Sequence, residues 1–283
     1  MLDNLVFLKR KWPPIKDKPA LVLVAFGTSS PAQVVFDCFY HQLQKQLPAY
    51  KVYWAFTSDI LRARSNRKGR RVLSLHETLA ALRAEGFLRA VVQPLFVFPG
   101  LEYREVLEVC RSFPGLRLLV GEPLFMRWSN VSKVLELVKP RFLPEKEGLN
   151  ILVAHGTDLA SDGANMVYLG LDYLVEQNFS NVVVATVEGI PGVERALTRA
   201  KVYPGAKVQF LPLMYVAGYH IMQDVLGAKD SWRKRLEAAG KQVLCPTLEY
   251  QGLTLYQGLG FYPEINNLFI QEIKRLLSFL EAL

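Results

Sequence analysis

The chain has few of the residues that mark disulfide-stabilised or membrane-spanning proteins. Its three cysteines, Cys38, Cys110 and Cys245, are widely spaced, odd in number and form no CxxC pair. This pattern argues against a disulfide framework and against a cysteine-rich zinc site. No stretch of 18 or more apolar residues is free of charge, which excludes a membrane-spanning helix. An acidic residue and a basic cluster interrupt the N-terminal segment, which is unlike a secretory signal, so we expect a cytoplasmic protein.

The chain also lacks the short motifs of the commonest α/β enzymes. Two glycine turns, FGTSS at 26–30 and HGTD at 155–158, lead toward expected helices and could bind phosphate at a helix N-terminus. Neither turn has the spacing of a dinucleotide-binding or ATP-binding glycine loop, so both ligands have poor support. The G-x-S-x-G motif is absent as well, which disfavours an ordinary serine hydrolase.

Charge and hydropathy describe a packed, basic protein. Hydrophobic residues make up 51% of the chain, and the formal net charge is +8. A basic surface favours anionic partners. We interpret the only dense basic run, RARSNRKGRR at 62–71, as a solvated loop, and therefore do not expect nucleic acid as a partner. A polycarboxylate ligand would also suit the charge.

Short apolar runs and helical stretches alternate along the chain. The runs are rich in Val and Leu and are bounded by Gly, Pro or polar residues, which is typical of buried parallel strands. They lie at 20–26, 50–56, 90–98, 116–121, 150–155, 181–187 and 207–216. Amphipathic stretches of helical length, such as 74–86 and 192–200, separate most of them. This alternation predicts an α/β fold with parallel sheets and crossover helices.

The two halves of the chain resemble each other. Three pairs of segments align in the same order: 22–29 with 151–158, 52–58 with 182–188, and 94–102 with 212–220. One such match could be chance, but three in order indicate a duplication. We therefore predict two similar α/β domains, at 1–130 and 131–283. The C-terminal helix, from about Pro263 to Leu283, is expected to pack back on the first domain.

The repeat directs attention to one position near the end of each of three expected strands. In the second half these positions hold His155, Glu188 and His220. Ligands of open parallel sheets bind at the carboxyl ends of the strands, so the three side chains are expected to face one cleft. Two imidazoles and a carboxylate suit a divalent ion such as cobalt, nickel, iron or zinc. Three protein ligands would leave coordination positions open for chemistry.

The first half carries a different set, Phe26, Ser58 and Glu102, at the three matching positions. These residues cannot form an equivalent metal site, so the repeat predicts a single metal per chain. The remaining histidines, His41 and His76, fall inside amphipathic helical stretches and are expected to be surface or partly packed residues.

Each candidate also has an ordinary structural interpretation. A strand-end histidine such as His155 or His220 could cap a helix or satisfy a turn. Glu188 could be a solvated loop carboxylate. The joint placement of the three residues favours the metal site over these separate roles.

Taken together, several segments resemble the anaerobic-type sirohydrochlorin cobaltochelatases of the class II chelatases. The segments are VAFGTS, AFTS, LFVFPGLEYREV, VAHGT, TVEGIPGVE, LPLMYVAGYHIMQD and DSWRKRLEAAG. The resemblance implies two Rossmann-like α/β domains around a tetrapyrrole cleft. It also implies His155, Glu188 and His220 as metal ligands, with Glu102 as the acidic residue across the cleft. One departure is Phe96, because many relatives carry a histidine there.

The resemblance implies ATP-independent insertion of Co²⁺ into sirohydrochlorin, an early step of anaerobic cobalamin biosynthesis, with Fe²⁺ (for sirohaem) or Ni²⁺ as further metals. His155 is the expected proton acceptor, and Glu102 could accept protons or position the ring. No cofactor beyond the substrate metal and no membrane partner is expected. Two alternatives stay open from the sequence: a non-catalytic carrier of metal or tetrapyrrole, and a phosphosugar or nucleotide enzyme on the same fold class. The oligomeric state cannot be predicted.

Overall fold

The computed structural model describes residues 13–67, 69 and 71–282. The prediction about a secretory signal therefore falls largely on residues 1–12, outside the described part. Two residues of the basic run at 62–71, numbers 68 and 70, lie outside it as well. No helix in the described part is long and apolar enough to cross a membrane.

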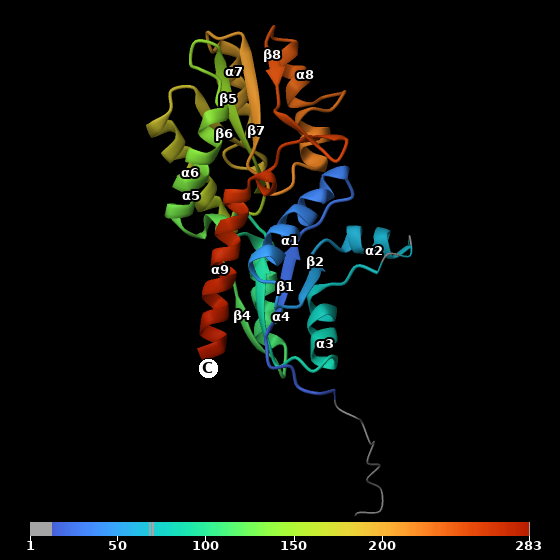
Figure 1. Cartoon of the computed structure of the whole chain (residues 1–283). Helices are drawn as coiled ribbons and strands as arrows, with labels where there is room; N and C mark the ends of the chain where they lie inside the picture. Colours follow the sequence, from blue (N-terminus) through green and yellow to red (C-terminus); the bar gives the residue numbers. More distant parts are fainter. Residues whose placement is uncertain (1–12, 68, 70, 283) are drawn as a thin grey trace, which may run out of the picture.

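Two four-stranded parallel sheets form the framework, one in each half of the molecule (Figure 1). The first has the order β2 (Val52–Phe56), β1 (Ala20–Ala25), β3 (Arg89–Pro94) and β4 (Arg117–Val120). The second has the order β6 (Val182–Gly189), β5 (Gly148–Thr157), β7 (Lys207–Pro212) and β8 (Gln242–Leu244). The two sheets therefore share one topology, which confirms the α/β fold with parallel sheets.

The predicted register of the repeat is also visible in matched hydrogen bonds. In the first half the Leu95 N–H donates to the Val24 carbonyl at 2.7 Å, and in the second half the Leu213 N–H donates to the Val153 carbonyl at 2.7 Å. Leu95 aligns with Leu213 in sequence, and Val24 aligns with Val153. The duplication thus extends from the sequence to individual backbone contacts.

Helices connect and cover the strands. They are α1 (Val34–Gln46), α2 (Asp59–Arg67), α3 (Leu75–Ala84), α4 (Leu101–Ser112), α5 (Trp128–Val138), α6 (Ala164–Asn178), α7 (Val193–Val202), α8 (Trp232–Glu237) and α9 (Pro263–Ala282). A hairpin of β9 (Thr247–Tyr250) and β10 (Leu253–Tyr256) precedes α9. Short 3₁₀ turns occupy 31–33, 124–126, 139–141 and 259–261, and a π-helical turn spans Ile221–Val225.

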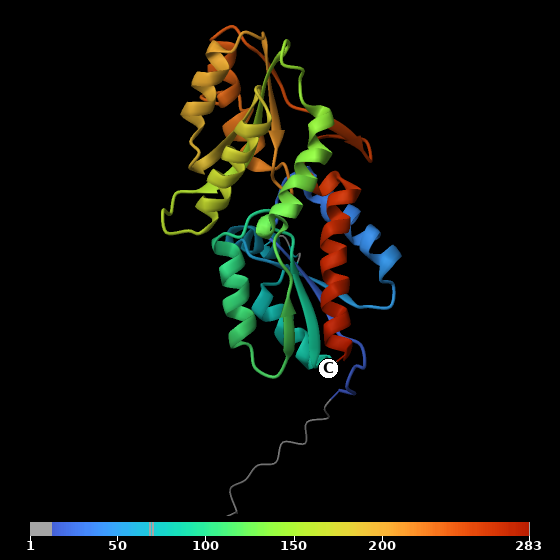
Figure 2. The same ribbon diagram turned by 90° about the vertical axis from the view of Figure 1, so that its left-hand side faces the viewer.

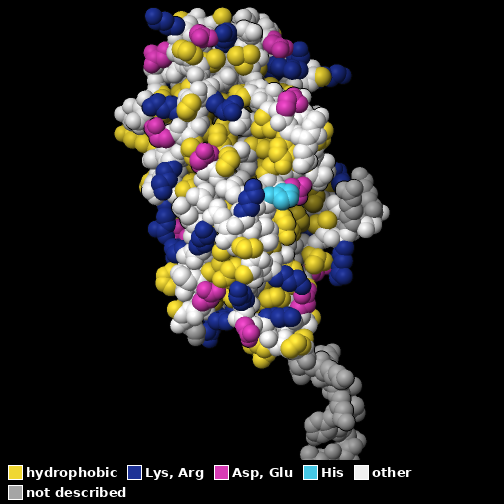
Figure 3. Space-filling model, viewed as in Figure 1, with side chains coloured by type: hydrophobic (Ala, Val, Ile, Leu, Met, Phe, Trp, Pro, Cys, Tyr) yellow, Lys and Arg dark blue, Asp and Glu magenta, His cyan; other side chains and the backbone are white. Residues whose placement is uncertain are grey.

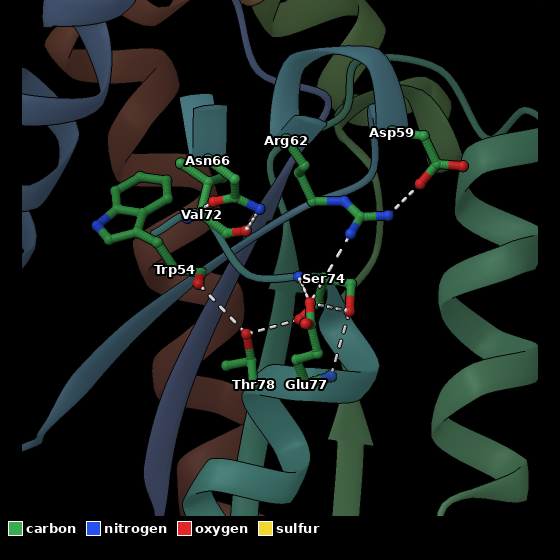
Figure 4. Close-up of polar contacts among 8 residues, drawn as sticks. All are labelled: Trp54, Asp59, Arg62, Asn66, Val72, Ser74, Glu77 and Thr78. Carbon is green, nitrogen blue, oxygen red and sulfur yellow. Dashed lines mark hydrogen bonds and ion pairs between the residues drawn. The ribbon is translucent and has the colours of Figure 1, made fainter. Parts of the chain in front are cut away.

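Local hydrogen bonds explain where α3 begins and how α2 is held against it. Ser74 and Glu77 form a capping box, in which each side chain accepts from the other residue's backbone N–H. The Arg62 guanidinium of α2 donates to Asp59, and its Nη1 lies 3.7 Å from the Glu77 carboxylate (Figure 4). The hydrogen bonds from Ser74 lower the pKa of Glu77, and the nearby charge of Arg62 lowers it further. One face of α2 is therefore fixed to the start of α3.

The largest apolar core belongs to both halves. It includes Leu23 and Val91 of the first sheet, Leu152 and Val184 of the second, and the buried face of α9. Two smaller clusters lie within the separate halves. The shared cluster makes the two sheets one packed unit.

Helix α9 begins in the second half and runs down along the first, beside β3, β4 and α1 (Figures 1 and 2). At its start, the Tyr215 hydroxyl donates to Asn266; near its end, Arg89 donates to the Leu280 carbonyl at 2.9 Å. The expected domain limit at residues 130 and 131 falls inside α5, which packs against α9. The division at that point stays a prediction.

Two strands are shorter than the apolar runs predicted. The expected strands 90–98 and 207–216 end at Pro94 and Pro212. Proline has no N–H to donate, so it suits the last position of a strand. The residues that follow stay apolar because they are buried, among them Leu95 and Leu213. In the sequence, these buried apolar loops therefore could not be told apart from the strands that they follow.

Candidate metal centre

Two of the predicted ligands lie in contact. His155 stands near the carboxyl end of β5, and His220 begins the π-helical turn Ile221–Val225. Their Nε2 atoms are 3.1 Å apart, and the rings meet edge to face with centroids 4.6 Å apart. Both side chains are half-buried. The fold therefore brings together two histidines that are far apart in sequence.

The Nδ1 partners determine what the two Nε2 atoms can do. His155 Nδ1 lies 3.1 Å from the Gly156 carbonyl oxygen, and His220 Nδ1 lies 2.8 Å from Asp224 Oδ2. A carbonyl and a carboxylate only accept hydrogen bonds, so both Nδ1 atoms are assigned as donors. In the neutral imidazoles each Nε2 then carries a lone pair. Two lone pairs that face each other require a shared proton or a metal ion between them.

The spacing of the nitrogens suits a single metal ion. Two nitrogens bound at about 2.1 Å to one ion, at tetrahedral or octahedral angles, lie roughly 3.0–3.4 Å apart. The observed 3.1 Å between His155 and His220 falls within that interval. The pair can therefore act as two adjacent ligands of one divalent ion without a large movement.

Glu188 lies on the same sheet edge but not in the pair. It is an exposed residue near the end of β6, and its backbone is in register with Gly156. Gly156 has φ +81°, and a Cβ there would lie 1.8 Å from the Glu188 carbonyl oxygen, so only glycine fits between His155 and Thr157. Among the residues that the structure describes, no three His, Cys, Asp or Glu side chains form a metal-holding group. Glu188 as a third ligand stays a prediction.

The matching positions of the first half have other roles. Phe26 follows β1 and is exposed. Ser58 accepts a hydrogen bond from the Leu61 N–H and so supports the start of α2. Glu102 lies in the first turn of α4, and His220 lies beyond the end of β7, so the expectation that both mark strand ends was wrong. Glu102 and His220 each follow a buried apolar loop that the sequence pattern had assigned to the preceding strand.

The two halves approach each other closely beside His220. A Cβ at Gly218 would lie 3.1 Å from the Thr28 hydroxyl oxygen, and Thr28 follows β1 in the other half. Thr28 and Ser30 hydroxyls are in turn 2.9 Å apart. The glycine of the AGYH segment therefore permits contact between the first-half loop and the loop that carries His220.

Several exposed apolar side chains follow the strands of the two sheets or neighbour His220 in sequence. They follow the ends of β1, β5 and β6 or adjoin His220: Phe26, Leu159, Ile190, Tyr219 and Met222. Lys and Arg side chains are spread over the surface rather than gathered in one patch on the face shown in Figure 3. The loops after the strands thus expose apolar side chains within a basic molecule.

Asp224 is a site residue that the sequence reasoning did not single out. It lies four residues after His220 and binds its Nδ1. The i, i+4 spacing within AGYHIMQD was the available signal, since residues at this spacing share a helix face. Phe96, where relatives were expected to carry histidine, packs against the core of the first half.

Comparisons with known proteins show the family of the chain. The sequence profile of the family described as cobalt chelatase (CbiK) matches residues 19–278. The chain belongs to the cobalt chelatase family. The sirohydrochlorin cobaltochelatase CbiKC of Nitratidesulfovibrio vulgaris is 28% identical over 249 residues, covering 83% of this chain and 86% of the relative. The sirohydrochlorin cobaltochelatase of Salmonella typhimurium is 27% identical over 270 residues, covering 92% and 97%.

Solved structures support the fold of this cobalt chelatase family member. SirB from Bacillus subtilis with Fe³⁺ matches with a TM-score of 0.62 at 16% identity, covering 94% of this chain and 98% of the other. CbiX, described as the terminal enzyme for biosynthesis of siroheme in denitrifying bacteria, matches with a TM-score of 0.51 at 17% identity, covering 90% and 98%. At these identities the likeness concerns the fold.

Proposed function

We propose that this chain inserts Co²⁺ into sirohydrochlorin without ATP, as an early step of anaerobic cobalamin biosynthesis. One observation carries the proposal: two imidazole Nε2 atoms converge at 3.1 Å near the sheet edge of a cobalt chelatase family member. Two curated relatives bear the name sirohydrochlorin cobaltochelatase, which supports the choice of tetrapyrrole. The three cysteines are free, which suits a reducing compartment such as the cytoplasm.

The reaction exchanges one divalent ion for two pyrrole protons. His155 and His220 hold the incoming ion, and Glu188 approaches as a third ligand when substrate is bound. Open coordination positions let the ring nitrogens replace the protein ligands one at a time. His155 then accepts one proton as its Nε2 leaves the ion, and the second passes to Glu102, or to water where Glu102 only orients the ring. These residues need no nucleotide and no resident cofactor.

Charge supports sirohydrochlorin over less anionic rings. Sirohydrochlorin bears eight carboxylates, and the chain has a formal net charge of +8. Opposite charge raises the local concentration of such a ligand and speeds its association. Exposed apolar side chains on the loops after the strands would cover the face of the ring.

The donor set leaves the choice of metal open among neighbouring ions. Imidazole and carboxylate ligands bind cobalt, iron and nickel, and selection in cells also depends on metal supply. We propose Co²⁺ as the main substrate and Fe²⁺, for sirohaem, as a second, with Ni²⁺ as a further metal to test.

An absorbance assay tests the proposal. Purified protein is mixed with excess sirohydrochlorin and with Co²⁺, Fe²⁺ or Ni²⁺ in turn, against reactions without protein. We expect many turnovers with Co²⁺, well above the uncatalysed rate. Stoichiometric binding without metallated product would instead identify a carrier. No spectral change with any tetrapyrrole would favour an enzyme of another substrate class.

A further inference from the structure

Two helices that meet between the halves begin without a cap of their own. The N-cap residues are Gly100 for α4 and Gly163 for α6, and neither can supply a side-chain acceptor. The first N–H groups of a helix need partners, and a side-chain oxygen is the usual one. Asp162, which directly precedes Gly163, is only 3% exposed.

The Asp162 carboxylate serves both helices. Its Oδ1 accepts a hydrogen bond from the Ala164 N–H of α6 at 3.1 Å, and its Oδ2 accepts one from the Leu101 N–H of α4 at 3.2 Å. The Arg104 guanidinium of α4 lies 3.9 Å from Oδ1. One buried carboxylate therefore joins a helix of the second half to a helix of the first.

The surrounding residues are shaped for this contact. A Cβ at Gly100 would lie 3.4 Å from Asp162 Oδ2, so the start of α4 and the carboxylate are separated by no more than van der Waals contact. On the other side, the Asp162 N–H and the Asn165 amide both donate to the Leu159 carbonyl. The loop that carries Asp162 is thus held in place by the second half alone, independently of its contact with Leu101.

We propose that Asp162 is a positioning residue for the metallation reaction, because it sets the place of Glu102 relative to the histidine pair. Glu102 follows the capped residue Leu101, and its Oε2 lies 3.6 Å from a Cβ built at Gly100. The loop of Asp162 in turn follows β5, which carries His155. The carboxylate therefore ties the helix of Glu102 to the loop after the His155 strand by one hydrogen bond, from the Leu101 N–H, while its other oxygen caps α6.

Loss of this carboxylate has a defined consequence. The first turn of α4 loses its cap, and the two halves lose a direct polar link at this side of the cleft. The shared apolar core and the Thr28–Gly218 contact remain, so the fold is expected to persist. A displacement of about 1 Å at a reacting group can lower a rate on the order of 10²-fold. Metal binding by His155 and His220 does not depend on α4 and is expected to be unchanged.

The role of Glu102 in this inference rests on the proposed function, so the test has two separate readouts. The first is hydrogen exchange at the amides of the first turn of α4, which reports the contact itself. The second is kcat for cobalt insertion, measured with the Kd for Co²⁺. The variants are Asp162→Ala, Asp162→Asn, and Asp158→Ala as a matched control, because Asp158 is an exposed carboxylate of the same loop.

In Asp162→Ala we expect the backbone amides of the first turn of α4 to exchange hydrogen faster and kcat to fall 10- to 100-fold. The Kd for Co²⁺ should stay within about twofold of wild type. Asp162→Asn keeps an acceptor for one of the two N–H groups and should recover part of both losses. Asp158→Ala should resemble wild type. If Asp162→Ala does not fold, the folded Asn variant carries the test.

Wild-type exchange in α4 for both Asp162 variants would overturn the inference. So would wild-type kcat together with faster exchange, because the contact would then be structural only. If the wild-type protein does not metallate sirohydrochlorin, the proposed function fails while the exchange data still decide whether Asp162 joins the halves.

Discussion

Each imidazole of the candidate centre depends on the partner of its Nδ1 atom. Gly156 and Asp224 accept hydrogen bonds from these atoms and so direct both Nε2 lone pairs to one point. Neither partner is a metal ligand, yet each determines how a ligand is oriented. The direction of the two lone pairs is therefore set by residues that lie behind the imidazoles.

Substitution of either histidine should stop metallation without unfolding the protein. Both side chains are half-buried at a sheet edge and contribute little to the apolar core. We expect His155→Ala and His220→Ala each to lower the rate of cobalt insertion by more than about 100-fold, beyond the 10- to 100-fold typical of outer partners. The exposed residues His41 and His76 provide matched alanine controls, and their variants should retain wild-type rates. Wild-type insertion by either site variant would remove that histidine from the mechanism.

Asp224→Asn tests the orienting bond separately. An amide can accept from His220 Nδ1 but carries no charge to strengthen the bond, and it can also present its N–H₂ group instead. We expect the affinity for Co²⁺ to fall about 10- to 100-fold, measured by calorimetry. An unchanged affinity would mean that His220 is held by its packing alone.

The sequence identified some site residues better than others, for physical reasons. His155 and His220 stand out because few histidines occur in the chain and both lie within repeated segments. Asp162 could not be found in the same way, since its importance lies in a contact with Leu101 of the other half. Such a contact has no local pattern, and only the folded chain reveals it.

At the scale of whole elements, alternation and hydropathy predicted the sheets well and the strand ends poorly. The strands β3 and β7 end at proline, but the buried loops that follow continue the apolar pattern. Hydropathy reports burial and not hydrogen bonding, so a buried loop and a buried strand look alike. The same ambiguity hid the fact that Glu102 and His220 begin helical turns.

Helix α2 carries exposed arginines and packs against the turn that follows β1. Leu61 of α2 lies against the Gly27 turn after β1, and Arg62 pairs with Asp59 of the same helix and with Glu77 of α3. Ile60, Arg64 and Arg67 share the remaining face, at i, i+4 and i+7, and are exposed. The interpretation of the whole basic run as a solvated loop was therefore wrong for its first part, which is helical.

We expect this free face to contribute to binding of the carboxylates of sirohydrochlorin. The double variant Arg64→Glu/Arg67→Glu should raise KM for sirohydrochlorin several-fold and leave kcat nearly unchanged, because the change acts on association and not on metal transfer. Added salt should raise the wild-type KM and have less effect on the variant. An exposed pair of another element, Lys139→Glu/Arg141→Glu in the turn at 139–141, serves as a charge-matched control. An equal rise in KM for both double variants would mean that the net charge of the protein, and not this face of α2, determines substrate binding.

At the scale of the whole molecule, duplication explains both the similarity and the difference of the halves. The sheets share one strand order, and paired hydrogen bonds such as Leu95 to Val24 recur in both. Only the second half holds histidines at the repeated positions, while the first supplies Phe26, Ser58 and Glu102. Helix α9 and the shared core then hold the halves as one unit.

The most direct test of this account is a calorimetric titration of the protein with Co²⁺, performed on the wild type and on the double variant His155→Ala/His220→Ala. The account predicts one tight site per chain in the wild type, because the first half has no equivalent of the pair. It predicts that the double variant folds and has no tight site. Two tight sites in the wild type, or one that persists in the double variant, would contradict the assignment of the metal to His155 and His220.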